Sequence, residues 1–393
     1  MFFIIISYIL SFKLECIPMR SWIEISRSAF NHNISLLAST MQPMQLAVII
    51  KANAYGHGLL PIATLAENNP SIAMLCVIGE DELIQVRAQG IKKPILSLSY
   101  RVENPDHFLS LNAGLVVYDE DMIASINAAA SKRNIKASIH LKVDTGLARL
   151  GFFADQIPPI LEKIKSWYPH VHLEGILTHL SHKNPDGIEW SLNQIATFTE
   201  LVRELHTSGQ KFPMIHALSS NGCVFPSPRA THLRIGHHMY GFGKFMPDFK
   251  HEDGTNDTLK LVGTWKTKIH QLKNIDTGTY VGYIRTYKTT RPTRLAILPV
   301  GYSDGYPRTL SNKGNVLIHG IPAPILGIIS MNLIAVDVTD IALQHSVEVN
   351  DEVILMGHQH PAIHSDTLSK DGESIPVELW SRINHSIPRI IVD

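Results

Sequence analysis

Eight short apolar runs, separated mostly by segments long enough for a helix, follow one another through residues 46–235. The runs are continuous rather than alternating, which is typical of parallel strands buried on both faces. Eight strand-and-helix units in this order predict a (β/α)8 barrel of the TIM type. Amphipathic patterns predict the clearest helices at 29–41 and 190–206. The predicted strands are 46–50, 74–78, 94–98, 115–118, 138–143, 173–177, 214–218 and 232–235.

The pattern changes after the polar, turn-rich segment 246–257. Beyond it, short β-branched runs alternate with glycine-containing turns, which is typical of an antiparallel all-β domain. A chain of 393 residues also exceeds the size at which one core usually stops growing. We therefore predict an α/β plus all-β chain, with a barrel domain at 19–255 that binds a cofactor and a mostly antiparallel β-domain at 256–393.

The first eighteen residues do not fit this organisation. The stretch from Phe2 to Phe12 is apolar, but it is too short to span a bilayer as a helix and has no basic segment typical of a secretory signal. We interpret residues 1–18 as an extension from a false upstream start, with Met19 as the true start. A degenerate export leader is the alternative.

The composition of the chain limits which kinds of binding partner we expect. The chain has 35 basic and 35 acidic residues, so no net field attracts nucleic acid or an anionic membrane. A small neutral or zwitterionic substrate fits better. The three cysteines, Cys16, Cys76 and Cys223, are widely separated and odd in number, which favours a reducing compartment. We expect a cytoplasmic protein without a transmembrane segment. Its 21 histidines show no ligand spacing that predicts a metal site.

Lys51 follows the first predicted strand and opens the glycine-containing turn of AVIIKANAYGHG at 47–58. On a barrel, residues just past the carboxyl end of a strand lie on the active-site face. A lone lysine there more often extends along the strand end to solvent. Other polar residues are predicted near Lys51, however. His179, Ser219 and Arg234 lie at the last three predicted strands and therefore belong on the same face of the barrel. Arg234 lies in an apolar run, where a buried guanidinium needs a partner.

A phosphate site is predicted on this face. The loops after strands seven and eight of such barrels usually bind phosphate, and here they hold Ser219 and the backbone of Gly236 and His237. A lysine, a phosphate cradle and a buried arginine together suggest pyridoxal 5'-phosphate. Lysine supplies the Schiff base for this cofactor, and a charged side chain tunes its pyridine nitrogen.

Six motifs identify a family resemblance. The stretches AVIIKANAYGHG, HLKVDTGLARLGF, HLRIG, VGYIRTY, LPVGYSDGYPR and GIISMN resemble those of the alanine racemases, in order, from about Trp22 to the C-terminus. The resemblance implies a barrel followed by a β-domain, and a homodimer whose active site is completed by the partner chain. It also implies pyridoxal 5'-phosphate and the interconversion of L-alanine and D-alanine, which supplies D-alanine for peptidoglycan.

The resemblance assigns residues to the cofactor. It implies that Lys51 holds the cofactor covalently, that Tyr55 and Ser219 bind its phosphate, that His179 packs against the ring and that Arg234 faces the pyridine nitrogen.

The resemblance also implies a second base. Racemisation removes the α-proton on one face of a planar intermediate and returns a proton to the other, so two groups must flank the cofactor. The implied pair is Lys51 and Tyr283, the latter from the partner subunit, with Tyr302 in a supporting motif. For the substrate carboxylate, the resemblance implies Arg149 and the backbone amide of Met331. Lys142 matches a lysine that is often carbamylated in the family and then holds that arginine.

Two positions depart from the family pattern. Asn332 stands where aspartate is usual, and His385 stands where many relatives have a tyrosine that crowds the substrate. A broadened pocket would make the chain a racemase of wider specificity, for example one that accepts serine. A lyase on the same barrel is a more distant alternative, because it would need a His/Cys/Asp cluster in the second domain.

Overall fold

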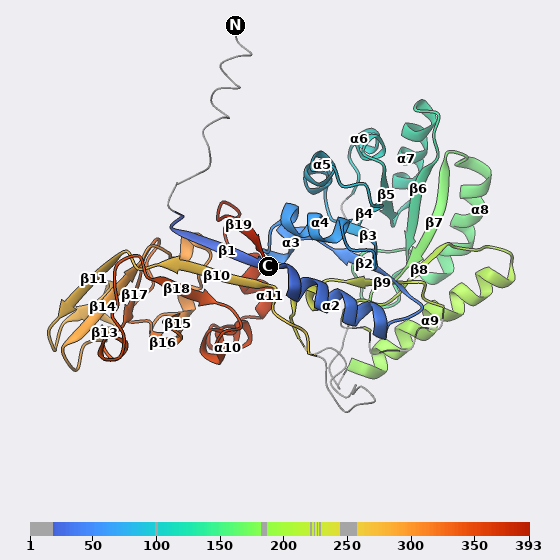
Figure 1. Ribbon diagram of the computed structural model, residues 1–393. Coiled ribbons are helices and arrows are strands. Elements are labelled where there is room, and N and C mark those ends of the chain that lie inside the picture. The colour runs from blue at the N-terminus through green and yellow to red at the C-terminus, as the bar shows by residue number, and fades with distance from the viewer. Residues whose placement is uncertain are drawn as a thin grey trace, which may run out of the picture. The chain divides into compact units, whose positions relative to one another are not determined.

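The computed structural model describes residues 19–98, 101–181, 187–220, 222–223, 225, 227, 229–243 and 258–393 (Figure 1). These residues form two compact units. The barrel unit contains residues 24–263, 375–385 and 389–393, and the β unit contains residues up to 23, 264–374 and 386–388. The predicted extension at 1–18 and the predicted boundary near 255 lie outside the described residues.

The barrel unit is built on one parallel sheet of eight strands, in the order β8-β7-β6-β5-β4-β3-β2-β9. A parallel bridge between Ser219 and Arg234 joins the two ends of this order, so the sheet is nearly closed. All eight predicted runs contribute a strand, which confirms the predicted barrel. The strands are β2 Gln45–Ile49, β3 Ile72–Val77, β4 Ile95–Ser97, β5 Ala113–Val117, β6 Ala137–Lys142, β7 Val171–Leu177, β8 Met214–His216 and β9 His232–Ile235.

Helices cover the outer face of this sheet (Figure 1). The two helices predicted most clearly are present as α2 and α9, and the Ser26 hydroxyl caps α2 by accepting the Ala29 N–H at 3.0 Å. The helices are α2 Arg27–Thr40, α3 Lys51–Tyr55, α4 Leu59–Glu67, α5 Glu80–Ala88, α6 Pro105–Ser110, α7 Glu120–Lys132, α8 Ile157–Trp167, α9 Ile188–Thr207 and α11 Pro376–Ser381, with 3-10 turns η1 Ala154–Gln156 and η3 His237–Tyr240.

The β unit is antiparallel, as predicted. Its ladders pair β10 with β18, β15 with β16 and β18, β14 with β11 and β17, and β12 with β13. The strands are β1 Ser21–Ser26, β10 Gly263–Lys268, β11 Gln271–Ile275, β12 Tyr280–Val281, β13 Tyr287–Lys288, β14 Thr293–Leu298, β15 Asn315–Ile318, β16 Ile321–Pro324, β17 Ile334–Asp337, β18 Glu352–Met356 and β19 Arg389–Val392, of which β1, β10 and β19 extend into or belong to the barrel unit. The remaining elements are α10 Ser365–Asp371 and the 3-10 turns η4 Tyr283–Arg285, η5 Tyr302–Asp304, η6 Arg308–Leu310, η7 Ile341–Leu343 and η8 Pro361–Ile363.

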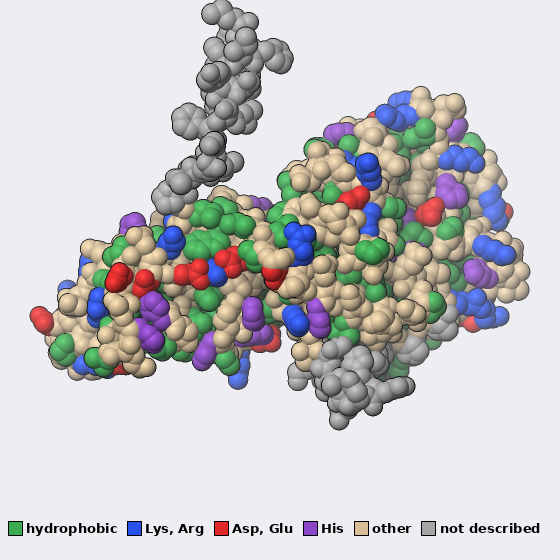
Figure 2. All heavy atoms as spheres, viewed as in Figure 1, with side chains coloured by type: hydrophobic (Ala, Val, Ile, Leu, Met, Phe, Trp, Pro, Cys, Tyr) green, Lys and Arg blue, Asp and Glu red, His purple; other side chains and the backbone are tan. Residues whose placement is uncertain are grey.

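The helices and the charges of the surface bear on possible membrane or nucleic-acid contacts. Among the residues that the structure describes, no helix is both long and apolar enough to cross a bilayer. Basic and acidic side chains both occur on the face shown in Figure 2, in keeping with the equal numbers of the two charges.

The turn that follows Lys51 is supported from inside the barrel unit. The His57 ring lies between Tyr240 and Trp380, with centroid distances of 4.5 Å and 4.6 Å. Arg389 donates from Nε and Nη2 to the Gly56 carbonyl oxygen at 3.1 Å and 2.9 Å. Gly56 has a φ of +86°, and a Cβ there would lie 1.9 Å from the Trp380 carbonyl oxygen. The end of α11 and the last strand therefore fix the shape of this turn.

We expect Gly56→Ala to destabilise the chain much more than Gly90→Ala. Both glycines have a left-handed φ, but a Cβ at Gly90 meets nothing within 4 Å. The conformation alone costs an alanine about 1 to 2 kcal/mol, and overpacking adds roughly 1 to 3 kcal/mol at Gly56. Urea denaturation of both variants measures the two losses of unfolding free energy. Equal losses would mean that Trp380 does not constrain the turn.

Candidate active site

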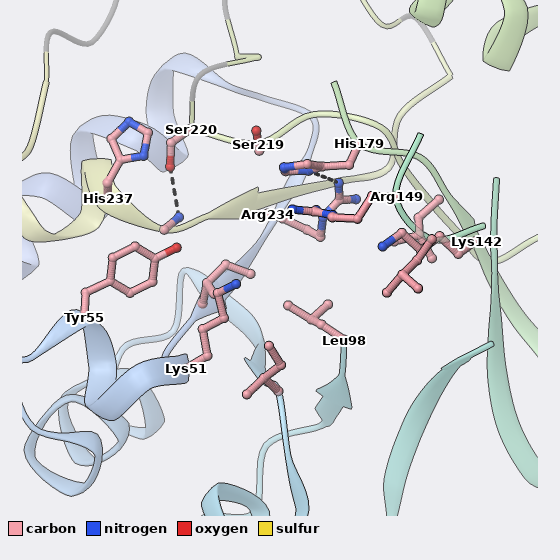
Figure 3. A pocket seen from close by; sticks show the side chains of 15 residues that line it. Lys51, Tyr55, Leu98, Lys142, Arg149, His179, Ser219, Ser220, Arg234 and His237 are labelled. Atoms are coloured by element: carbon pink, nitrogen blue, oxygen red, sulfur yellow. Dashed lines mark hydrogen bonds between the residues drawn. The ribbon is translucent and has the colours of Figure 1, made fainter. Parts of the chain in front are cut away.

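A cavity of about 340 Å³ lies at the carboxyl ends of the barrel strands (Figure 3). Its lining comes entirely from the barrel unit. The structure brings nine of the predicted site residues together there, although they are spread over nearly two hundred positions of the chain. These nine are Lys51, Tyr55, Lys142, Arg149, His179, Ser219, Arg234, Gly236 and His237.

The cavity is cationic. Four of its lining residues carry basic side chains, namely Lys51, Lys142, Arg149 and Arg234, and no aspartate or glutamate is among the described residues that line it. Cations gathered in a low-dielectric cleft attract anionic ligands. The cavity therefore fits a ligand that carries phosphate, carboxylate or both.

Lys51 opens a left-handed turn of the backbone. Its successors Ala52, Asn53, Ala54 and Tyr55 have φ values of 54°, 52°, 52° and 54°. This conformation costs an L-residue roughly 1 to 2 kcal/mol, so four in a row persist only because surrounding contacts hold them. Such strain is concentrated at functional sites. Here it presents the side chains of both Lys51 and Tyr55 to the cavity (Figure 3).

Two hydroxyls meet at one end of the cavity, beside Gly236. The Ser220 hydroxyl accepts the Gly236 N–H at 2.9 Å, and a Cβ at Gly236 would lie 2.6 Å from the Tyr55 hydroxyl oxygen. Burial raises the pKa of Tyr55 to about 12, so its phenol keeps its proton and can donate to an anion. Glycine is required at 236 because Tyr55 occupies the space of a side chain.

Ser220 was not predicted from the sequence. Ser219 and Ser220 are adjacent and both line the cavity, but only the Ser220 hydroxyl points to Gly236, while that of Ser219 points away from it (Figure 3). Both serines follow β8, which ends at His216, so the alternation of side chains along a strand does not choose between them. No sequence signal distinguishes Ser220 from Ser219.

Arg234 is almost fully buried, and no carboxylate among the described residues forms a salt bridge with it. It donates from Nη2 to the Thr178 carbonyl oxygen at 2.6 Å and from Nη1 to the carbonyl oxygen of His216, whose Nδ1 lies 3.0 Å from Nη1. The His216 ring in turn lies 3.0 Å from His140 Nδ1. Burial, and then nearby cations, lower the pKa of His140 and His179 to about 3 and that of His216 well below its ordinary value. Neutral imidazoles and carbonyls therefore surround a guanidinium whose pKa burial lowers only to about 10.

Asp144 shapes the loop that carries Arg149. Its Oδ1 accepts N–H bonds from Gly146, Leu147 and Ala148 at 2.9 to 3.1 Å, and its Oδ2 accepts the Arg149 N–H at 2.9 Å. Burial raises the pKa of Asp144, but these four donors together bring it below its ordinary value. The carboxylate thus binds the backbone of the loop instead of an arginine or lysine side chain.

Lys142 is a buried amine among cations, with a relative exposure of 5%. Burial first, and then Arg149, Arg234 and Lys51, lower its pKa to about 8, although Asp144 raises it. A substantial part of the Lys142 amines is therefore neutral slightly above neutral pH.

The low pKa of Lys142 predicts that Lys142→Met stabilises the chain at pH 7. Between about pH 8 and the ordinary lysine value of 10.5, the unfolded chain binds more protons than the folded one, so the wild type gains stability as pH rises through this window. Because methionine carries no charge, the variant avoids the cost of burying a charged amine. It should be more stable than the wild type at pH 7 by roughly 2 to 3 kcal/mol, with the difference disappearing toward pH 10.5. Urea denaturation in CO2-free buffer without cofactor measures it.

The exposed lysine Lys132 provides a matched control. Lys132→Met should change the free energy of unfolding little at any pH. If Lys142→Met instead destabilises the chain equally from pH 7 to 10, burial does not disfavour the charge on Lys142.

Three predicted residues lie elsewhere, in the β unit. Tyr283, Met331 and Tyr302 are exposed by 66%, 54% and 43%, and none lines the cavity of this single chain. Ile284 and Arg285, next to Tyr283, have left-handed φ values of 62° and 54°. A strained turn thus presents an exposed tyrosine on the β unit.

The two departures from the family pattern also lie outside the cavity lining. The Asn332 amide donates to the Ser303 hydroxyl at 2.8 Å, and His385 is exposed. Among the described residues, no group of three His, Cys, Asp or Glu side chains could hold a metal ion.

The residues present fit pyridoxal 5'-phosphate. Lys51 offers an amine at the wall of the cavity, and its pKa is lowered by burial and by Arg149. Tyr55 and Ser220 offer hydroxyls for a phosphate beside Gly236. Arg234 offers a buried cation in the same cavity.

The family models, curated relatives and solved structures reported below are all alanine racemases. The family models that match are described as alanine racemase, N-terminal domain, over residues 25–243, and alanine racemase, C-terminal domain, over residues 262–391. Curated alanine racemases of Methylacidiphilum infernorum and Clostridium perfringens are 35% and 32% identical, over 94% of this chain and 92% and 94% of their own lengths.

Solved structures agree. An alanine racemase of Clostridium difficile 630 is 28% identical with a TM-score of 0.84, over 95% of each chain. The alanine racemase of Bartonella henselae with covalently bound pyridoxal phosphate is 26% identical with a TM-score of 0.80, over 95% of this chain and 100% of that one.

Proposed function

Because the chain belongs to the alanine racemase family, we propose that it interconverts L-alanine and D-alanine with pyridoxal 5'-phosphate held at Lys51. The family resemblance and the prediction of an amino-acid racemase are confirmed by the matches. One observation carries the proposal. The half-buried amine of Lys51, on a strained turn, shares a cavity with three other cations and two hydroxyls beside a glycine, and none of the described residues that line this cavity is a carboxylate.

The cofactor, when bound, withdraws electrons from the substrate so that its α-proton becomes acidic. Lys51 is its proposed point of covalent attachment. Tyr55 and Ser220 donate to the phosphate, with Ser219 and the backbone of Gly236 and His237 beside them. His179 packs against the ring as a neutral imidazole, and Arg234 faces the pyridine nitrogen.

Arg234 limits how strongly the ring attracts electrons. A guanidinium keeps its own proton near neutral pH, since burial lowers its pKa only to about 10. It therefore protonates the ring nitrogen less readily than a carboxylic acid. With the cofactor bound, Arg234 would thus limit electron withdrawal by the ring and disfavour side reactions such as transamination.

Proton transfer requires one base on each face of the substrate. Lys51 serves one face, and burial and then Arg149 lower its pKa toward the range in which an amine accepts a proton. We assign the other face to Tyr283 of the partner subunit. Its exposure of 66% and the strained residues Ile284 and Arg285 beside it support this assignment.

A homodimer follows from the same assignment. Ile284, Met331 and Leu333 of the β unit are exposed by 76%, 54% and 45%, and exposed apolar side chains favour an interface. Arg149 and the backbone amide of the partner's Met331 hold the substrate carboxylate. The neutral form of Lys142 can add CO2, and the resulting carbamate would then bind Arg149.

We place this dimer in the cytoplasm, because the three widely separated cysteines, Cys16, Cys76 and Cys223, favour a reducing compartment. A two-domain division near residue 255 is part of the proposal, since the two family matches end at 243 and begin at 262.

Two variants separate attachment from proton transfer. Lys51→Ala should lose the visible absorbance of the bound cofactor and all racemisation, because the covalent attachment is gone. Tyr283→Phe should keep that absorbance and lose racemisation by roughly 10² to 10⁴-fold, the usual contribution of a positioned proton transfer. Absorbance spectra and initial rates in both directions measure these effects.

Tyr280→Phe is the matched control, because Tyr280 is also exposed in the same part of the β unit. It should racemise like the wild type. Full activity of Tyr283→Phe in both directions would refute the two-base assignment.

Substrate breadth is tested with the full-length chain, pyridoxal 5'-phosphate and either L-alanine or L-serine, followed by chiral chromatography. We expect rapid formation of D-alanine and little D-serine. Comparable D-serine would mean that Asn332 and His385 accompany a broadened specificity, since pockets discriminate a small added group by only about 1 to 3 kcal/mol. No D-product from either would favour a lyase.

A further inference from the structure

Glu82 lies behind the Lys51 turn, and neither sequence motifs nor the cavity lining single it out. Its Oε1 accepts the Ala52 N–H at 2.6 Å, and its Oε2 accepts the Ile78 N–H at 2.9 Å. The residue is 7% exposed, and it forms no salt bridge with any described residue. A buried carboxylate without a cationic partner is unusual, so its two backbone contacts require an explanation.

These two contacts connect the ends of neighbouring strands. Ala52 follows Lys51 after β2, and Ile78 follows β3, which pairs with β2 along the barrel. Lys51 and Ile78 both line the cavity. Glu82 itself is in the first turn of α5, where the helix dipole favours a negative charge. One side chain therefore ties the start of the left-handed turn to the adjacent cavity wall.

Glu82 also opposes the effect of the cavity's cations on the pKa of Lys51. The charged groups that influence Lys51 are Arg149, which lowers its pKa after burial does, and Glu82, which raises it. Lys142 and the neutral His179 also lie within electrostatic reach of Lys51. Burial raises the pKa of Glu82, and the N–H groups of Ile78 and Ala52 favour its ionised form.

We propose that Glu82 is a positioning residue for Lys51. Its carboxylate holds the left-handed turn so that the Lys51 amine faces the cavity, and it places one negative charge behind that amine. This inference rests on the proposed attachment of pyridoxal 5'-phosphate to Lys51, and it adds a residue that acts on the cofactor only through the backbone.

Glu82→Gln tests the proposal with little change of shape. The amide has one acceptor oxygen, so its NH2 group faces an N–H donor and one of the two contacts is lost. The negative charge is lost as well. With only cations left to influence it, the Lys51 amine should have a lower pKa than in the wild type, and the turn should be less well fixed.

Two measurements on full-length apoprotein follow. Competitive acetylation with acetic anhydride across pH, read by mass spectrometry of the Lys51 peptide, gives the pKa of Lys51 without cofactor. Titration with pyridoxal 5'-phosphate, followed by absorbance, gives the affinity. For Glu82→Gln we expect a lower Lys51 pKa and an affinity reduced roughly 10- to 100-fold, as for one charge-assisted hydrogen bond.

The controls distinguish positioning from folding. Asp81→Asn removes the same charge from the same helical turn at an exposed position, and both quantities should stay near wild type. Glu82→Asp keeps the charge but is too short to reach both N–H groups, so it should weaken cofactor affinity with a smaller change in the Lys51 pKa. It also provides the test if Glu82→Gln does not fold.

The possible results distinguish a wrong role for Glu82 from a wrong proposed function. If Glu82→Gln lowers only the thermal midpoint and leaves the pKa and cofactor affinity of Lys51 unchanged, Glu82 is merely structural and the inference is wrong. If wild-type protein does not attach pyridoxal 5'-phosphate at Lys51, the proposed function is wrong, whereas the Lys51 pKa still reports on Glu82.

Discussion

The site depends on the left-handed turn from Ala52 to Tyr55. This turn is unfavourable by itself, because each L-residue in it pays roughly 1 to 2 kcal/mol of steric strain. It exists because contacts from distant parts of the barrel unit hold it, including Trp380 against Gly56 and Arg389 on the Gly56 carbonyl. In return it sets an amine and a phenol side by side at the mouth of the barrel, which a regular right-handed helix beginning at Lys51 would not do.

A second constraint is how the cavity stays cationic. Lysines and arginines in a protein interior normally pair with carboxylates, and a paired cation attracts a ligand weakly. Here Asp144 binds four backbone N–H groups and Glu82 binds two. These two carboxylates thus shape the loops that carry Arg149 and Lys51, and they do so by binding backbone N–H groups. The positive charge remains available to an anionic ligand.

Much of this architecture could be predicted from the sequence, for identifiable reasons. Eight continuous apolar runs predict buried parallel strands, and the barrel geometry then brings Lys51, His179 and Arg234 to one end. Finer detail was not predictable. Choosing Ser220 over Ser219 requires the conformation of the loop after β8, and the left-handed turn and the proposed role of Glu82 depend on tertiary contacts. Tyr283 came from family resemblance alone, because an exposed tyrosine in a β-domain has no local pattern of its own.

The buried histidines explain which groups respond to pH. The pKa values of His140 and His179 are about 3, because burial and then neighbouring cations disfavour a further positive charge. Arg234, with a pKa of about 10, stays protonated over the same range. His140, His179 and Arg234 therefore each keep one charge state through neutral pH. A change of charge slightly above neutral pH comes instead from an amine such as Lys142, whose pKa is about 8.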